Sequence, residues 1–138
     1  MKKETRNQIW VALKIWIIAV FINATCGTAI IANFFMSYED LNIFRTGLLL
    51  GSLISFPIFI LLLIIIKISC SRTYGKMIFL NVLVTGVLLT VLASILFFYQ
   101  TNFDQLSVDL CLCSCFSAIV SISIRYKPLL KLEKISQL

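Results

Sequence analysis

Histidine is absent from the 138-residue sequence, which removes the commonest metal ligand and the commonest proton relay of enzymes. The sequence also has no glycine-rich phosphate-binding loop, no pair of acidic residues embedded in an apolar segment, and no nucleophile accompanied by a histidine base. These absences exclude the usual catalytic sets. We therefore expect a protein that is not an enzyme and that needs no cofactor or metal.

Charge is also scarce, and this excludes the ordinary soluble class. Charged residues make up 13% of the chain and hydrophobic residues 60%, whereas soluble domains carry about 25% charged residues. A soluble helical bundle would need a polar face along each helix, and none of the long apolar segments has a continuous one. The composition predicts an integral membrane protein, in direct contact with the lipid bilayer.

Long apolar segments fill most of the chain. A helix needs about 20 apolar residues to cross a hydrocarbon core about 30 Å thick. Short connections between such helices favour antiparallel neighbours. We predict a single all-α membrane domain over residues 1–138, a four-transmembrane-helix up-down bundle, with an outer loop from Asn33 to Thr46. The predicted spans are approximately Ile9–Phe35, Gly47–Ile68, Met77–Tyr99 and Leu106–Ile124.

The basic residues predict an orientation. Eleven of the twelve Lys and Arg residues lie before the first span or, for Lys14, just inside it, around the second connection, or after the fourth span; the exception is Arg45. Because short cytoplasmic loops carry the excess of Lys and Arg, we expect both termini in the cytoplasm. The basic residues are dispersed, which favours lipid head-group contact over a nucleic-acid partner. Abundant Ile, Lys, Asn and Phe are typical of AT-rich bacterial genomes, so a bacterial inner membrane is expected.

Small residues recur at helical spacing in every span. The clearest case is Gly47 and Gly51, continued by Ser55, which forms a face that another helix backbone can approach closely. Two explanations stay open, packing within the bundle and association of two chains. The corresponding stripes of the other spans are Ala19, Asn23 and Gly27; Gly86, Thr90 and Ser94; and Ser107, Cys111, Ser114, Ala118 and Ser121.

Polar residues inside a span are expensive in lipid and often functional. The candidates are Asn23 in the first span, Asn81 and Thr85 in the third, and Asp109 in the fourth. Asn81 and Thr85 lie one turn apart on the same helix face. Asp109 is either an interfacial acid in contact with water or an acid at the mouth of a polar cleft that faces Asn33.

The five cysteines do not predict a disulfide framework, because their number is odd and no outer loop collects them. On a helix Cys111 and Cys115 share a face, whereas Cys113 points elsewhere, so the three cannot form one tetrahedral metal site. Two interpretations remain for Cys111 and Cys115, small packing residues or a redox pair.

Both ends of the chain carry interfacial signals. Trp10 and Trp16 flank Lys14 in the first span, a pattern that predicts aromatic anchors beside a lysine that reaches the head groups. In the cytoplasmic tail, residues 125–138, apolar residues recur every third position at Leu129, Leu132, Ile135 and Leu138. This tail is either a short interfacial helix or a disordered end.

Three functional hypotheses follow. The first is a non-enzymatic accessory, adaptor or immunity-type protein that acts through helix–helix contacts, as a homo-oligomer or within a larger membrane complex. The second is a small oligomeric transporter or channel, which requires Asp109, Asn23 and Asn81 to face one cavity. The third is thiol redox chemistry at Cys111 and Cys115. We favour the first, because the sequence offers no catalytic set.

Overall fold

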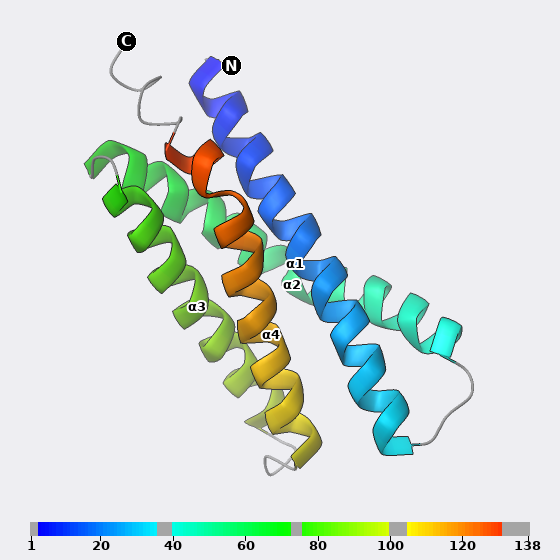
Figure 1. The fold of residues 1–138 in the computed structure, drawn as a ribbon. Helices are drawn as coiled ribbons and strands as arrows, with labels where there is room; N and C mark the ends of the chain where they lie inside the picture. Colours follow the sequence, from blue (N-terminus) through cyan, green and yellow to red (C-terminus); the bar gives the residue numbers. More distant parts are fainter. Residues whose placement is uncertain (1–2, 36–39, 73–75, 100–104, 131–138) are drawn as a thin grey trace.

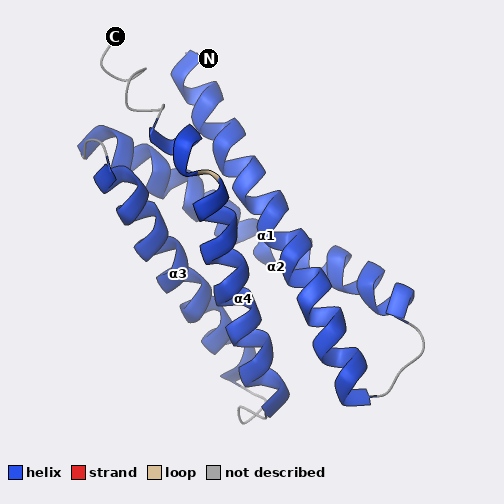
Figure 2. Cartoon of the chain, viewed as in Figure 1, coloured by secondary structure: helices blue, strands red, loops and turns tan. Residues whose placement is uncertain are grey.

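The fold of the chain, given by a computed structural model that describes residues 3–35, 40–72, 76–99 and 105–130, is all-helical (Figure 2). Four helices form it, α1 (Lys3–Phe35), α2 (Asp40–Arg72), α3 (Lys76–Phe98) and α4 (Gln105–Ile124). Each helix contains a stretch long and apolar enough to cross a membrane, so the all-helical fold with four such helices is confirmed. These stretches are Thr5–Ile31, Phe44–Ser71, Lys76–Leu96 and Gln105–Ile124.

The first two helices are longer than their apolar segments. The expected outer loop from Asn33 to Thr46 is wrong at both ends, because α1 continues to Phe35 and α2 already begins at Asp40. Each of these helices has 33 residues, a length of about 50 Å, which exceeds a hydrocarbon core of about 30 Å. Apolarity thus marks the part of a helix that contacts lipid and not the point where the helix ends.

The helices follow an antiparallel up-down order. The start of α1, the end of α2, the start of α3 and the end of α4 lie at one end of the bundle (Figure 1). We call this the terminal end, and the other the opposite end. α1 packs against α2 and α4, and α3 packs against α4 and α2. The four helices therefore form a ring in which each contacts its neighbours in sequence and α4 closes on α1.

The tightly packed core lies toward the terminal end. Large β-branched side chains dominate it, and Ile66, Ile78 and Val82 are fully buried. Interiors of this kind are held by close packing, which in a membrane is also the main force between helices. The core consists of Ala12 and Ile15 from α1, Leu62, Ile66 and Cys70 from α2, Ile78 and Val82 from α3, and Ile122 and Leu129 from the last part of the chain.

The chain turns after α4 and returns to the core. Helical structure resumes at residues 126–130, and the amide of Leu129 donates to the carbonyl of Arg125 at 3.0 Å. Leu129 is fully buried in the core. The interfacial-helix alternative for the tail would expose Leu129 to lipid, which its burial contradicts. The other apolar positions of that pattern, Leu132, Ile135 and Leu138, lie outside the described residues.

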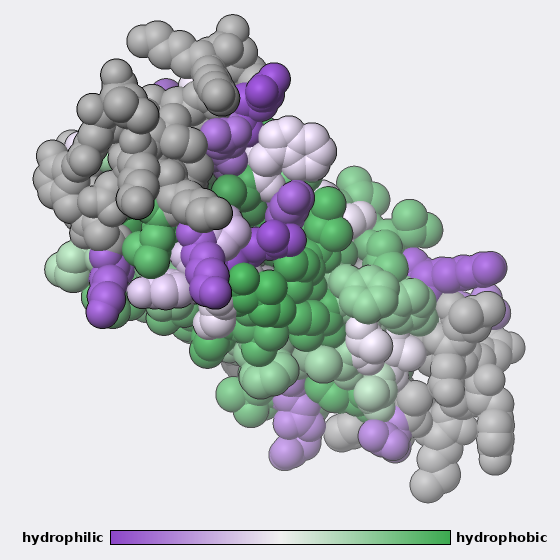
Figure 3. All heavy atoms as spheres, turned by 45° about the horizontal axis from the view of Figure 1, so that its top comes forward, coloured by the Kyte–Doolittle hydropathy of each residue, from purple (hydrophilic) through white to green (hydrophobic). Residues whose placement is uncertain are grey.

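The surface suits contact with lipid. Figure 3 shows hydrophobic side chains over the middle of the visible face and hydrophilic ones mostly toward its ends. Large apolar side chains are exposed on all four helices, for example Ile17, Leu53, Leu88 and Leu112. Trp10 is exposed as an interfacial anchor should be, and the Lys14 ammonium lies 5.7 Å from the centroid of its ring.

Candidate functional site

The bundle opens toward the end opposite its core. The first half of α2 diverges from the second half of α3, so that α2 begins on one side of the molecule and α3 ends on the other (Figure 1). Residues of all four helices line one cleft of about 340 Å³ in this half. α1 and α4 form its floor, because they remain in contact there, and α2 and α3 form its walls. We call this space the α2–α3 cleft.

The small-residue stripes of the four helices meet at this cleft. Short side chains leave unfilled volume where larger ones would close the bundle, so the stripes account for the existence of the cleft. The lining residues from these stripes are Ala19, Asn23 and Gly27 on α1, Gly47, Gly51 and Ser55 on α2, Thr90 and Ser94 on α3, and Ser114 and Ala118 on α4.

The glycines of α2 and the glycine of α3 have opposite surroundings. A Cβ atom built on Gly47 or Gly51 would meet no heavy atom within 4 Å, whereas one built on Gly86 would lie 2.8 Å from Cδ1 of Ile122. Gly86 thus permits close contact between α3 and α4. Gly47 and Gly51 line the cleft, so of the two explanations left open for them, packing against another helix of the same chain is not what the structure shows.

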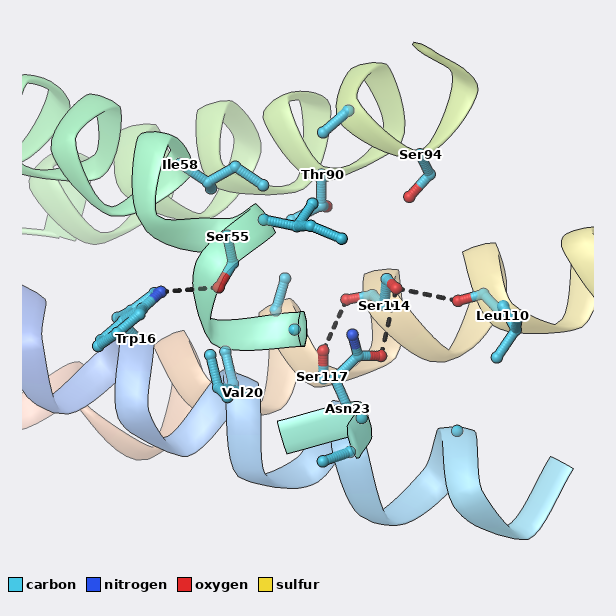
Figure 4. Close-up of a pocket in the computed structure, with 18 of the residues that line it drawn as sticks. Trp16, Val20, Asn23, Ser55, Ile58, Thr90, Ser94, Leu110, Ser114 and Ser117 are labelled. Carbon is cyan, nitrogen blue, oxygen red and sulfur yellow. Dashed lines mark hydrogen bonds between the residues drawn. The ribbon is translucent and has the colours of Figure 1, made fainter. Parts of the chain in front are cut away.

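The cleft ends toward the core at a tryptophan. The indole Nε1 of Trp16 donates to Oγ of Ser55 at 2.9 Å, joining α1 to α2 (Figure 4). The ring of Trp16 also lies 6.4 Å from that of Phe56 and 5.4 Å from that of Phe59. Trp16 is therefore a cleft residue and not the interfacial anchor that its position beside Lys14 suggested. Trp16 lies about two helical turns before Asn23, so the two side chains share one face of α1. This spacing is the sequence signal that could have identified Trp16 as a cleft residue.

Asn23 lies on the floor of the cleft. Its Oδ1 accepts hydrogen bonds from Oγ of Ser114 at 3.2 Å and from Sγ of Cys113 at 3.5 Å, which ties α1 to α4. The single hydroxyl hydrogen of Ser114 is shared between Asn23 and the carbonyl of Leu110, which lies 2.9 Å from Oγ. In Figure 4 the amide nitrogen of Asn23 has no hydrogen bond to the residues drawn. Its two N–H groups are donors that an occupant of the cleft could use.

Three other hydroxyls of the cleft lining are bonded to their own helices. Thr28 donates to the carbonyl of Ala24, Thr90 to that of Val87, and Ser117 to that of Ser114, at 2.7 to 2.8 Å. These bonds satisfy each hydroxyl hydrogen locally. The lining therefore presents mostly apolar surface to an occupant, although many of its residues are nominally polar.

The remaining polar candidates lie elsewhere. Asp109 is half-buried and lines a separate hollow with Cys26 and Cys113, formed by α1 and α4 alone and hence on the outer side of their contact. Thr85 donates to the backbone carbonyl of Asn81, and neither residue lines the α2–α3 cleft. The structure thus does not bring Asp109, Asn23 and Asn81 to one cavity. Asn33 is exposed and does not line the hollow of Asp109.

The cysteines form two pairs. Cys113 lies close to Cys26 across the contact of α4 with α1, and Cys115 lies close to Cys111 on α4. All five cysteines are free thiols. Within residues 3–35, 40–72, 76–99 and 105–130, no three His, Cys, Asp or Glu side chains are grouped so as to hold a metal ion. Sequence spacing predicted the shared face of Cys111 and Cys115, but the pairing of Cys26 with Cys113 depends on which helices pack together.

The chemistry of the α2–α3 cleft is that of a binding surface. Its described lining contains hydroxyls, one indole and one carboxamide but no titratable side chain, so it has no group to transfer a proton. Such a lining suits an apolar occupant that offers hydrogen-bond acceptors near Asn23. Comparisons of the chain with models of protein families, with curated proteins and with solved structures found no match.

Proposed function

We propose that this chain is a non-enzymatic membrane accessory protein, of the adaptor or immunity type, that binds a transmembrane helix of a partner protein at the α2–α3 cleft. The observation that carries the proposal is the open face of α2, where nothing lies within 4 Å of a Cβ built on Gly47 or Gly51. Small residues of this kind are where transmembrane helices approach each other most closely.

The size of the cleft defines its occupant. A helix with its side chains is about 10–12 Å across, so a volume of about 340 Å³ admits several apolar side chains and not the helix itself. The partner helix would lie over the mouth of the cleft and insert bulky side chains, such as Leu or Phe, between α2 and α3. One oxygen acceptor on that helix would meet the free donors of Asn23.

A separate partner fits this space better than a second copy does. Gly47 and Gly51 line the cleft and so belong to a recessed surface of the bundle. Two copies paired through this face would bring two concave surfaces together and leave both clefts unfilled. Since packing is the main force between helices in lipid, an occupant with protruding side chains gains more contact than a symmetric dimer.

The proposed orientation places the terminal end of the bundle in the cytoplasm of a bacterial cell, with the protein in the inner membrane. Positively charged side chains concentrate at this end, among them Arg6, Lys67, Lys76 and Lys127, whereas Arg45 lies near the start of α2 at the opposite end. This distribution supports the orientation through the positive-inside rule. The partner would then enter the cleft from the periplasmic half of the bilayer.

We do not extend the proposal to transport. That hypothesis requires polar groups around one shared path, but Asn23 faces the α2–α3 cleft and Asp109 faces a separate hollow. A redox role for Cys111 and Cys115 likewise lacks a reaction partner in the cleft, because neither cysteine lines it.

Photo-crosslinking in native membranes tests the proposal. A photoreactive phenylalanine analogue would replace Ile54, which lines the cleft and is half exposed, and Leu112 would serve as the matched position on the outer face of α4. We expect one discrete adduct with another membrane protein from position 54 and none from position 112. Adding Gly51→Leu should abolish this adduct, because the leucine fills the cleft.

Three outcomes would overturn the proposal. The same adduct from both positions would show contact without use of the cleft. An adduct that survives Gly51→Leu would show that the small face of α2 is not needed. A crosslink solely between copies of this chain would assign the cleft to a second copy.

A further inference from the structure

The charged side chain of Arg125 contains a buried N–H group that lacks a hydrogen-bond acceptor. It directly follows Ile124, the last residue of α4, and its side chain is half-buried. The guanidinium Nε is fully buried and has no hydrogen-bond partner. Because arginine stays charged in proteins, a buried N–H of this group without an acceptor is strongly unfavourable. The penalty would be removed if the side chain turned outward and this N–H met an anion.

The backbone around Arg125 is fixed in place. Its amide donates to the carbonyl of Ile122 at 3.1 Å, and its carbonyl accepts from the amide of Leu129 at 3.0 Å. Beyond it, the ring of Tyr126 packs edge-on against that of Phe79 with centroids 4.8 Å apart, and Leu129 is fully buried. These contacts fix the backbone before and after Arg125, so its side chain extends from a rigid part of the chain.

The described side chains offer Arg125 no internal anion. Asp109 is the only acidic residue whose side chain the structure describes. It lies toward the other end of α4, about 24 Å away along the helix axis. Arg125, in contrast, is the first residue beyond the apolar stretch Gln105–Ile124. A residue at that position lies at the level where the phosphate groups of a bilayer begin.

We propose that the side chain of Arg125 turns outward from its partly buried position and binds the phosphate group of an anionic phospholipid, with Nε and one Nη donating to two phosphate oxygens. Arginine presents these donors as a planar fork that matches phosphate in bidentate geometry. Lys127 is exposed nearby in sequence, and other cations share this end of the bundle. Their field attracts an anionic lipid over a zwitterionic one. The site depends on neither the α2–α3 cleft nor the side of the membrane on which Arg125 lies.

Native mass spectrometry of the full-length protein in mild detergent tests the site, with phosphatidylglycerol or phosphatidylcholine added in separate samples. We expect the wild type to retain one phosphatidylglycerol in preference to phosphatidylcholine. Arg125→Gln should reduce this retention about tenfold, the value of one charge-assisted interaction. Arg125→Lys should also reduce it, because lysine keeps the charge but loses the fork. The control Arg45→Gln changes an exposed arginine near the start of α2, at the opposite end of the bundle, and should stay within about twofold of the wild type.

Inorganic phosphate distinguishes the source of the anion. We expect a large excess of inorganic phosphate to leave the retained lipid in place, and displacement of the lipid would assign the site to a free anion. Equal retention by the wild type and Arg125→Gln would refute the site. Full retention by Arg125→Lys would refute the bidentate geometry and thus the proposal. If Arg125→Gln does not fold, Arg125→Lys decides the outcome.

Discussion

The two kinds of glycine in this bundle predict opposite responses to the same substitution. Gly51 faces the α2–α3 cleft with nothing within 4 Å of its Cβ position, whereas the Cβ position of Gly86 is 2.8 Å from Cδ1 of Ile122. Ile122 is itself 2% exposed and belongs to the core. A leucine at position 51 extends into open space, but a leucine at position 86 must displace a buried side chain.

Two contributions determine how much the free energies of unfolding of the two variants differ. Replacing a helix-interior glycine by leucine gains roughly 0.5–1 kcal/mol of helix propensity. This gain is similar at both positions, so the difference between the two variants isolates packing. Overpacking of a filled core costs about 1–3 kcal/mol. We expect Gly86→Leu to have a free energy of unfolding about 1–3 kcal/mol below that of Gly51→Leu, with Gly51→Leu at or slightly above the wild type.

Equilibrium unfolding in mixed micelles measures this difference. The purified protein would be titrated with a denaturing detergent while helix content is followed by circular dichroism. Loss of stability in Gly51→Leu equal to that in Gly86→Leu would refute the reasoning, because it would mean that the chain itself fills the cleft. The result is independent of any partner, since only the isolated protein is used.

Three further predictions use the same purified protein. Ser55→Ala removes the acceptor of the Trp16 indole and should lower the free energy of unfolding by about 0.5–1.5 kcal/mol, with a shift in tryptophan emission. Oxidation with a copper–phenanthroline reagent should join Cys26 to Cys113 within one chain with the loss of two hydrogen atoms, as detected by peptide mass spectrometry, and Cys26→Ser should lack this bond. Leu129→Ala should lower the free energy of unfolding by about 2–4 kcal/mol, because Leu129 is fully buried in the core.

Each of these predictions has a matched control. Ser52→Ala removes a hydroxyl that donates to the carbonyl of Leu49 in its own helix, so it should leave tryptophan emission unchanged. Cys70→Ser should still form the bond between Cys26 and Cys113. Leu112→Ala, on an exposed face, should change the free energy of unfolding by less than about 0.5 kcal/mol. Equal effects of a test variant and its control would contradict the contact concerned.

The number and order of the helices could be read from the sequence, because a bilayer imposes a minimum apolar length on every span. The ends of the helices could not be read from the sequence. Asp40, Asn42 and Arg45 are polar, yet α2 includes all three. Hydropathy reports contact with lipid, whereas a helix continues for as long as its backbone hydrogen bonds do.

The cleft could not be predicted from the sequence either, and the reason is different. Gly47, Gly51 and Gly86 give the same local signal, a small residue within an apolar helix, and yet two are open and one is tightly covered. The difference depends on which helix faces each glycine, and no local pattern contains that information. Trp16 makes the same point, since its neighbour Lys14 suggested the interface while its contact with Ser55 lies in the cleft.

The unequal packing along the bundle suggests how stability and binding are separated. In lipid, apolar surface alone does not drive helices together, and packing must do so. The large side chains of the core, such as Ile66 and Ile78, supply that packing at the terminal end. At the opposite end, the bonds of Trp16 to Ser55 and of Asn23 to Ser114 hold α1 against α2 and α4, and neither bond draws α2 toward α3. The cleft can therefore stay open at little cost to the fold, and the residues that line it can vary without unfolding the bundle.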